Sequence, residues 1–149
     1  MRLNKFLILW LSLFIAACER APSTALIAES EQTQVAAQSD NKALIQAFKN
    51  KKSDIFVEGS GVVKKLLPDD NKGSRHQKFL VTISDEQTLL FAHNIDLAPR
   101  IDAIQVGDSV QFRGEYVYNP KGGVMHWTHH DPQGGNKVGW IKHAGKVYE

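Results

Sequence analysis

Apolar and polar residues alternate along much of the chain from residue 55 onward, and this period of two predicts β-strands. Turn-forming Gly, Pro, Asn and Asp residues separate the alternating segments. Five segments are long enough for strands, and they cover residues 55–63, 79–83, 88–93, 110–118 and 124–130. Two shorter segments flank Ala144-Gly145 and predict a closing hairpin.

The segment before the first strand has a helical period instead. Leu44, Ile45 and Phe48 fall on one side of a helix, and Asp40 or Asn41 could cap its first turn. We therefore predict a short N-terminal helix that precedes the strands.

A second helical period follows the third strand. Leu97, Ile101 and Ile104 predict a short helix that Asp96 could cap. Three strands, a helix and a strand pair are the element order of an OB-fold. We expect a mainly β domain, a small five-stranded OB-fold-like barrel with one short helix between strands 3 and 4. A small β-sandwich is the alternative, and neither fold by itself specifies a function.

The first residues of the chain predict an export signal. Arg2 and Lys5 precede an uninterrupted apolar run over residues 6–16, which is too short for a mature membrane span of about 20 residues. The sequence Ile-Ala-Ala-Cys then ends at Cys18 and resembles the bacterial lipobox. We expect residues 1–17 to be a lipoprotein signal peptide and Cys18 to carry acyl chains such as palmitate, which anchor the protein to the membrane. A plain signal peptide cut nearby is the alternative.

The residues after Cys18 predict a flexible linker and a location in the cell envelope. Residues 18–40 are rich in Ala, Ser, Thr, Gln and Glu and have no strong period, as expected of a flexible linker. Glu19 follows the cysteine, and by resemblance to Gram-negative lipoproteins this favours the periplasmic face of the outer membrane. The barrel domain is then expected over residues 41–149.

Composition and charge narrow the classes of function. Hydrophobic residues make up 42% and charged residues 23% of the chain, as in a globular protein. The net charge is +2, but Arg2 and Lys5 lie in the predicted signal peptide, so the mature chain is neutral. Residues 41–149 carry 15 basic and 12 acidic residues, an excess too small to predict a nucleic-acid partner.

Histidines and charged residues near the strand ends are the candidates for a site. The candidate ligand-binding residues on the predicted barrel rim are His76, His93, Asp96, Arg100, His126, His129, His130 and Asp131. Most of them could instead stabilise loops: Asn94 or Asp96 could cap the helix, and Arg100 could pair with a carboxylate. Side chains of Tyr116, Tyr118, Trp127 and Trp140 could stack on a base or a sugar, although at least half of these four should be core residues.

A metal site is a second interpretation of the same histidines. His126 and His130 share one face of a regular strand, but four residues separate them by about 13 Å, too far for one zinc ion without a bend. Such a site would need a partner from elsewhere, and His93 is the first choice, which gives His93, His126 and His130 as metal candidates. We expect no cofactor, with zinc or another divalent metal as the alternative.

Catalytic motifs are few. Lipidation would consume Cys18, and the sequence contains no nucleophile elbow, phosphate-binding loop or dinucleotide-binding motif. A His-Asp pair that acts with a metal or water is the remaining enzyme-like interpretation. The sequence therefore favours a protein that is not an enzyme.

Several longer motifs resemble one protein family. They are His76-Gln77-x-Phe79, the segment HNIDLAPR at residues 93–100, Gly114-Glu115-Tyr116 and GGVMHWTHHDP at residues 122–132. The resemblance spans about residues 53–148 and is to a family of small exported bacterial proteins of unknown function. It implies export and the domain limits, and it implies no activity, substrate, cofactor or role for any residue.

These observations favour a lipid-anchored binding module in the periplasm that uses its His-rich rim for an unidentified ligand or envelope partner. The first alternative is a divalent-metal hydrolase that acts on nucleic acid or a phosphoester through the His/Asp cluster. The second is a structural envelope lipoprotein in which the histidines only stabilise loops.

Overall fold

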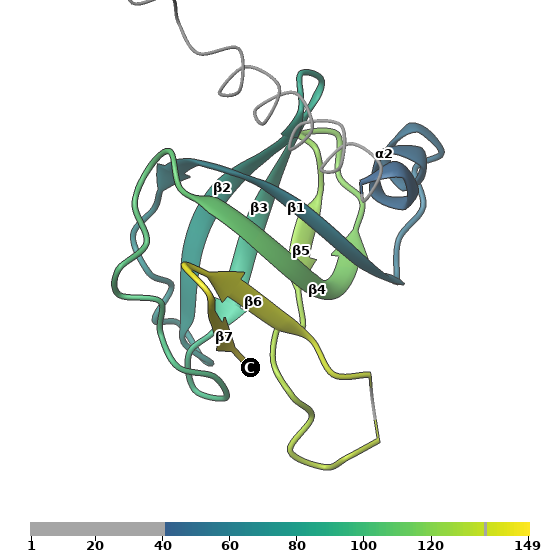
Figure 1. Ribbon diagram of the computed structural model, residues 1–149. Coiled ribbons are helices and arrows are strands. Elements are labelled where there is room, and N and C mark those ends of the chain that lie inside the picture. Colours follow the sequence, from purple (N-terminus) through teal and green to yellow (C-terminus); the bar gives the residue numbers. More distant parts are fainter. Residues whose placement is uncertain (1–40, 136) are drawn as a thin grey trace, which may run out of the picture.

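The computed structural model describes residues 41–135 and 137–149 of the chain (Figure 1). The predicted signal peptide, Cys18 and the tether lie outside the described residues. The described elements are α2 (Lys42–Lys49), β1 (Ile55–Leu66), β2 (His76–Ser84), β3 (Gln87–Asn94), β4 (Ser109–Val117), β5 (Val124–His126), β6 (Trp140–His143) and β7 (Lys146–Tyr148). Within these ranges, no helix is long and apolar enough to cross a membrane.

Five strands close into a barrel because β1 pairs with two partners. Residues 55–62 of β1 pair with β4, and residues 62–66 pair with β2, with a register shift after Val63. On the other side, β5 lies parallel to β3 and antiparallel to β4, which completes the circle β1-β2-β3-β5-β4. The closed circle confirms the predicted five-stranded barrel over the sandwich. The predicted final hairpin is also present, as β6 and β7, and extends the sheet from β4.

Side chains alternate between the two faces of each strand, so every second side chain points into the barrel, and most of these are apolar. The centre of the core holds Phe79, Phe91 and Phe112, all fully buried. The rings of Phe79 and Phe91 stack with their centroids 5.0 Å apart, and Phe112 meets Phe91 edge-on at 4.9 Å. The core residues in the described ranges come from residues 44–148, so this domain builds its own hydrophobic core.

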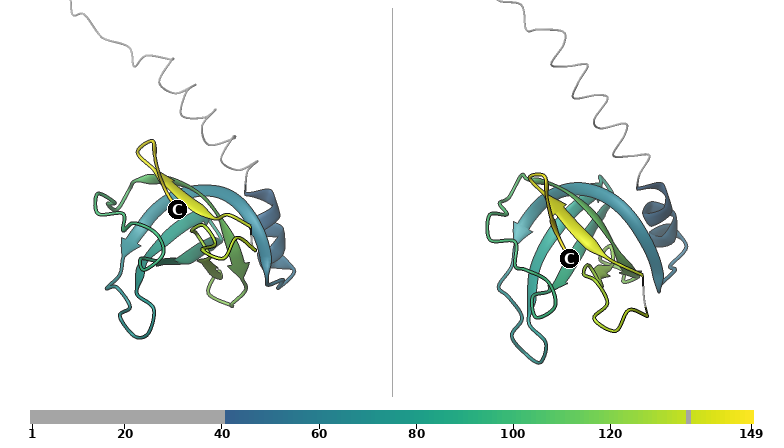
Figure 2. Two further views of the ribbon diagram at one scale, coloured as in Figure 1. Left: turned by 90° about the horizontal axis from the view of Figure 1, so that it is seen from below. Right: turned by 60° about the horizontal axis from the view of Figure 1, so that its bottom comes forward.

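The predicted N-terminal helix is present, but Asn41 has a different task from the predicted one. Its side chain makes no capping bond to the helix. Instead, its amide donates to the backbone oxygens of Ser60, at 2.8 Å, and Ile83, at 3.3 Å, and its oxygen accepts the Ser60 N–H at 2.9 Å. These bonds attach the start of α2 to β1 and β2. Both views of Figure 2 show the helix beside β1, outside the barrel.

The prediction of a helix between strands 3 and 4 is wrong. Residues 95–108 form a loop with turns that runs around one end of the barrel (Figure 1). The buried side chain of Gln77 holds the backbone of Ile101 from both sides, donating to its carbonyl at 3.0 Å and accepting its N–H at 2.9 Å. Ile101 and Ile104 are still buried in the core, so the spacing of the apolar residues reflects their burial and not a helix.

The predicted fifth strand is too long. The strand β5 ends at His126, because Trp127 takes a left-handed backbone conformation with a φ of 53°. The expectation that His126 and His130 share one face of a regular strand is therefore wrong, because the strand ends at His126. Thr128 and His129 are both buried, whereas His130 is exposed.

Candidate functional site

The outer surface of the barrel carries a row of three side chains, one aromatic, one acidic and one imidazole, where β1, β4 and β5 run side by side. Glu115 of β4 pairs in register with Phe56 of β1 and with His126 of β5. All three are half-buried, and Nε2 of His126 lies 3.8 Å from a carboxylate oxygen of Glu115. The sheet pairing thus brings a predicted site residue, His126, next to an acid and an aromatic ring that the sequence analysis did not select.

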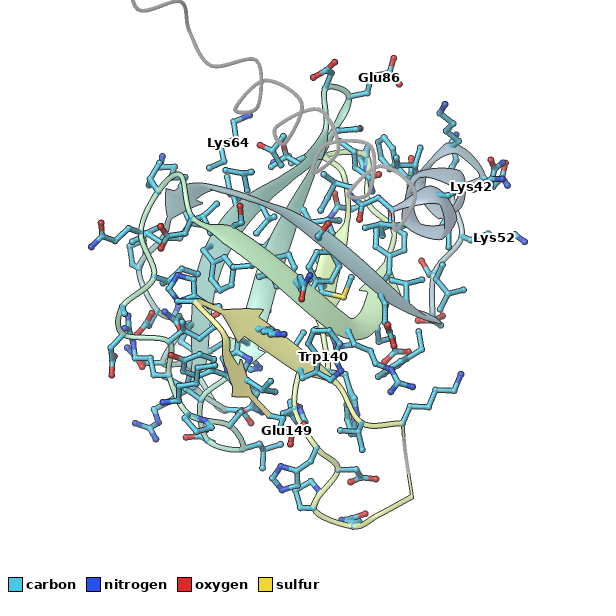
Figure 3. All side chains as sticks on the ribbon, in the orientation of Figure 1. Lys42, Lys52, Lys64, Glu86, Trp140 and Glu149 are labelled. Atoms are coloured by element: carbon cyan, nitrogen blue, oxygen red, sulfur yellow. The ribbon has the colours of Figure 1, made fainter. Side chains whose placement is uncertain are left out.

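A second row lies two residues further along β4. Arg113 stands in register between Glu58 of β1 and Trp140 of β6. Its guanidinium group lies 3.3 Å from the Glu58 carboxylate and 5.4 Å from the centre of the Phe56 ring. Figure 3 shows Trp140 near the root of the loop that joins β5 to β6. The two rows together form a surface that alternates aromatic, acidic and basic groups.

A pocket of about 290 Å³ opens beside the first row. Its walls are Asp54, Phe56, Glu115, Trp127 and Lys137. The first three come from the barrel side, and the last two come from the loop between β5 and β6, which we call the β5–β6 loop (residues 127–139). The ammonium group of Lys137 lies 5.8 Å from the centre of the Phe56 ring. The loop therefore supplies one wall of the pocket and the barrel the other.

Trp127 adopts a backbone conformation that is unfavourable for a large side chain. Its φ of 53° lies in the left-handed region, and Asp54, across the pocket, has a φ of 58°. Bulky residues pay about 1–3 kcal/mol for this conformation, and such positions concentrate at functional sites. The indole N–H of Trp127 donates to the backbone oxygen of Lys137 at 3.2 Å, so this ring is held in place at the wall.

The base of the β5–β6 loop is closed by Gly139. Its N–H donates to the backbone oxygen of His129 at 3.0 Å. A Cβ atom at this position would stand 1.8 Å from the backbone oxygen of Trp127, so only glycine allows the two ends of the loop to approach. This close approach folds the β5–β6 loop back on itself, with Trp127 at its start.

The other histidines of this motif stabilise the same loop. The ring of His129 is buried, packs against Trp127 at 4.9 Å, and its Nδ1 donates to the backbone oxygen of His130 at 2.7 Å. The carboxylate of Asp131 accepts the N–H groups of Gln133, at 3.0 Å, and Gly135, at 2.8 Å. These contacts leave the imidazole of His130 exposed at the surface of the loop.

His93 supports the loop from inside the barrel. It is fully buried, with Nε2 3.2 Å from the Pro99 carbonyl and Nδ1 2.8 Å from the Thr128 hydroxyl. A carbonyl can only accept, so Nε2 carries the hydrogen, and Thr128 donates to Nδ1. The pKa of His93 is lowered from 6.5 to about 4, mainly by burial and to a smaller degree by the nearby His129 and His76, against hydrogen bonds to Pro99 and Thr128 that raise it. The imidazole is therefore neutral at pH 7.

The remaining rim candidates join loops to each other at the end of the barrel. The carboxylate of Asp96 accepts the Arg75 N–H at 2.7 Å and the Arg75 side chain at 2.6 Å, and these bonds hold the pKa of Asp96 below its usual value. Arg100 pairs with Asp69 at 3.1 Å and with Asp102 at 3.0 Å. His76 begins β2 and exchanges two backbone hydrogen bonds with Asp70. These contacts confirm that Arg100 pairs with carboxylates.

The three metal candidates occupy different environments. His93 lies inside the barrel, His126 lies beside Glu115 on the outer surface, and His130 is exposed on the β5–β6 loop. In residues 41–135 and 137–149, no group of three or more His, Cys, Asp or Glu side chains is arranged to hold a metal ion.

The four aromatic candidates divide as expected. Tyr116 is fully buried and donates to the Gly122 carbonyl at 3.2 Å, while Tyr118 packs against Phe48 at 5.9 Å. Trp127 and Trp140 are half-exposed on the side of the pocket. The sequence did not single out Phe56, Asp54 and Lys137, because their proximity depends on the closure of the barrel and on the β5–β6 loop. The alternation that makes Phe56 an outward residue next to Ile55 was the available signal.

One protein family matches the chain over residues 26–149, and its description is "Protein of unknown function (DUF3465)". The chain belongs to this family. A comparison with curated proteins finds no match for this DUF3465 protein. The match confirms the expected family of unknown function, and it extends further toward the N-terminus than the expected residues 53–148.

Proposed function

We propose that this protein is a ligand-binding module that uses the pocket between the barrel and the β5–β6 loop. The observation that carries the proposal is the placement of Trp127, a half-exposed indole held in a strained backbone conformation at the wall of a pocket. A solvent-facing loop gains nothing from such strain unless the ring has a task there. The pocket, and not the histidine rim, is thus the working surface, and His126 is the rim residue that adjoins it.

The other rim residues support this surface. His93 holds Thr128, His129 packs on Trp127, and the Asp131 carboxylate shapes the loop. Each contact favours the arrangement of Trp127 over free movement of the loop. The histidine-rich motif is then a scaffold for binding rather than a set of ligand contacts.

We also propose that the module is carried to the cell envelope as a lipoprotein. The support is the apolar run at residues 6–16 followed by Cys18. Residues 18–40 would serve as the tether between the lipid on Cys18 and the barrel, at the periplasmic face of the outer membrane. Cells fed a palmitate analogue should label the wild-type protein and not the Cys18→Ser variant. Equal labelling of both proteins would contradict the anchor.

Nuclear magnetic resonance tests the binding site directly. The full-length protein in mild detergent, labelled with ¹⁵N, would be titrated with four probes: chitotetraose, tetralysine, tetraglutamate and inorganic phosphate. We expect at least one probe to shift the indole N–H signal of Trp127, which the Trp127→Phe variant assigns. Lys64→Ala is the matched control, because Lys64 is exposed at the other end of β1 (Figure 3). A Trp127 signal that no probe moves would overturn the proposal.

A further inference from the structure

The pocket carries charges of both signs, two acidic and one basic, and this mixture limits the class of ligand. Two carboxylates, Asp54 and Glu115, line the pocket together with the ammonium group of Lys137. At its edge, Arg113 is paired with Glu58 at 3.3 Å. A site for a strongly charged ligand would gather charges of one sign, as phosphate and carboxylate sites do. This site mixes both signs and favours a ligand without net charge.

The aromatic groups give the ligand a flat apolar face to pack against. The indole of Trp127 packs against the His129 ring at 4.9 Å, and Trp127 lines the pocket. The Phe56 ring already faces two cations, Arg113 at 5.4 Å and Lys137 at 5.8 Å. Phe56 therefore holds the polar groups of the wall in place, and Trp127 is the ring that is available to a ligand.

The polar groups around the indole offer both kinds of hydrogen bond. The carboxylates of Asp54 and Glu115 accept, and the Lys137 ammonium donates. The pocket therefore offers an aromatic ring together with hydrogen-bond acceptors and a donor. A ligand that suits it has one apolar face, which packs on the ring, and hydroxyl groups at its edges, which bond to the polar side chains. The C–H face of a sugar ring has this character, because its hydrogens carry partial positive charge and pack on the negative face of an indole.

We infer that the pocket binds a neutral saccharide, with Trp127 as the stacking platform and Asp54 and Glu115 as acceptors for its hydroxyl groups. This inference rests on the proposed binding function and names its ligand class. The Glu115 carboxylate lies beside His126, with 3.8 Å between its oxygen and Nε2 of the imidazole.

The second row of outward side chains extends the site beyond one sugar ring. Trp140 lies two strands away from Phe56 and two residues along β4, so the backbones at these two positions are separated by about 10 Å or more. A chain of several sugar units would reach from the pocket at Phe56 toward Trp140, where a monosaccharide would not. We therefore expect affinity to rise from a disaccharide to a tetrasaccharide.

The test uses the full-length protein in detergent with chitotetraose, cellotetraose and the disaccharides chitobiose and cellobiose as neutral probes, and with tetralysine and tetraglutamate as charged probes. In isothermal titration calorimetry, we expect a neutral probe to bind. Trp127→Ala should weaken its affinity by about tenfold or more, and Glu115→Gln by about threefold. Trp140→Ala should weaken the tetrasaccharide by about threefold and leave the disaccharide unchanged. Lys64→Ala should change neither.

The outcomes separate the two claims. If tetralysine or tetraglutamate shifts the Trp127 indole signal and the neutral probes do not, the saccharide inference is overturned and the binding function stands. If no probe moves that signal, both fail. Thermal unfolding of Trp127→Ala and of Glu115→Gln provides the check on folding, and Trp127→Phe, which keeps a ring, should retain part of the saccharide affinity. Equal affinity in Trp127→Phe and Trp127→Ala would also contradict stacking.

Discussion

The hydroxyl of Thr128 lies 2.8 Å from Nδ1 of His93, and both residues are fully buried. Thr128 follows Trp127 directly, so this contact joins the barrel interior to the strained residue at the pocket wall. Because Nε2 of His93 donates to the Pro99 carbonyl, the same imidazole also holds the loop between β3 and β4. One neutral histidine thus positions two loops at the same end of the barrel.

The first prediction concerns the pH dependence of stability. The pKa of His93 is lowered to about 4 in the folded protein, whereas the unfolded chain takes up this proton at a pKa of about 6.5. The unfolded state therefore binds the proton first, and the free energy of unfolding should fall by about 3 kcal/mol as the pH drops from 6.5 to 4. Urea unfolding at a series of pH values measures this loss.

A matched pair of variants isolates His93 in that experiment. His93→Gln has no titrating group and should flatten the curve between pH 6.5 and 4, although its stability at pH 7 is lower. His130→Gln removes an exposed imidazole and should keep the wild-type slope. A wild-type slope in His93→Gln would show that another group is responsible. The carboxylates of Asp96 and Asp108, whose pKa values are lowered, lose their contributions below this window.

The second prediction separates the ring of Trp127 from its backbone. Trp127→Ala and Trp127→Gly both remove the indole and its bond to Lys137, but only glycine relieves the left-handed backbone. We expect Trp127→Gly to be more stable than Trp127→Ala by about 1 kcal/mol, the reverse of the usual order in strands. Thermal or urea unfolding measures the difference. Alanine as the more stable variant would mean that Trp127 carries no backbone strain.

The third prediction concerns the closure of the β5–β6 loop. In Gly139→Ala the new Cβ atom would stand 1.8 Å from the backbone oxygen of Trp127, so the loop must open. We expect a loss of about 2–3 kcal/mol in unfolding free energy and a displaced indole N–H signal of Trp127. Gly135→Ala is the control in the same loop, since its Cβ would meet Asp131 at an ordinary 3.6 Å. Similar losses for both variants would contradict a specific role for Gly139.

The fourth prediction concerns the attachment of α2. Asn41→Ala removes three hydrogen bonds, two to Ser60 and one to Ile83, and leaves the Ser60 N–H without this partner. Buried backbone groups that lose a partner cost about 1–3 kcal/mol, so we expect a loss of that size in chemical unfolding. Lys42→Ala, at the exposed neighbouring position, should have little effect. If Asn41→Ala matched Lys42→Ala, the helix would be attached by its apolar face alone.

The barrel could be predicted from the sequence because strand alternation is a local signal. Phe79, Val81 and Ile83 point inward as their spacing indicated, and the element order then selects a closed barrel. The loop around Ile101 was mistaken for a helix because its apolar spacing comes from burial against the barrel end. Its backbone bonds go to Gln77, 24 residues away, and no local pattern reveals such a partner.

The site was only partly predictable for a related reason. The motif around Trp127 stood out in the sequence, but the regular alternation assumed there ends where the backbone turns left-handed. Phe56 and Glu115 meet only because β1 pairs with β4 across the closed barrel, and Lys137 arrives through the loop. The number of histidines favoured a histidine site, yet most of the histidines contact structural partners. Acidic side chains, aromatic rings and a lysine line the pocket instead.

An intermolecular nuclear Overhauser experiment on the full-length protein with chitotetraose would locate the saccharide directly. If Trp127 is the stacking platform, the sugar C–H protons will show contacts to the indole ring protons of Trp127, and Trp127→Ala will lose them. Contacts instead to outward side chains of β2 and β3, such as Leu80 and Leu90, would place the ligand on another face of the barrel and rule out the Trp127 site.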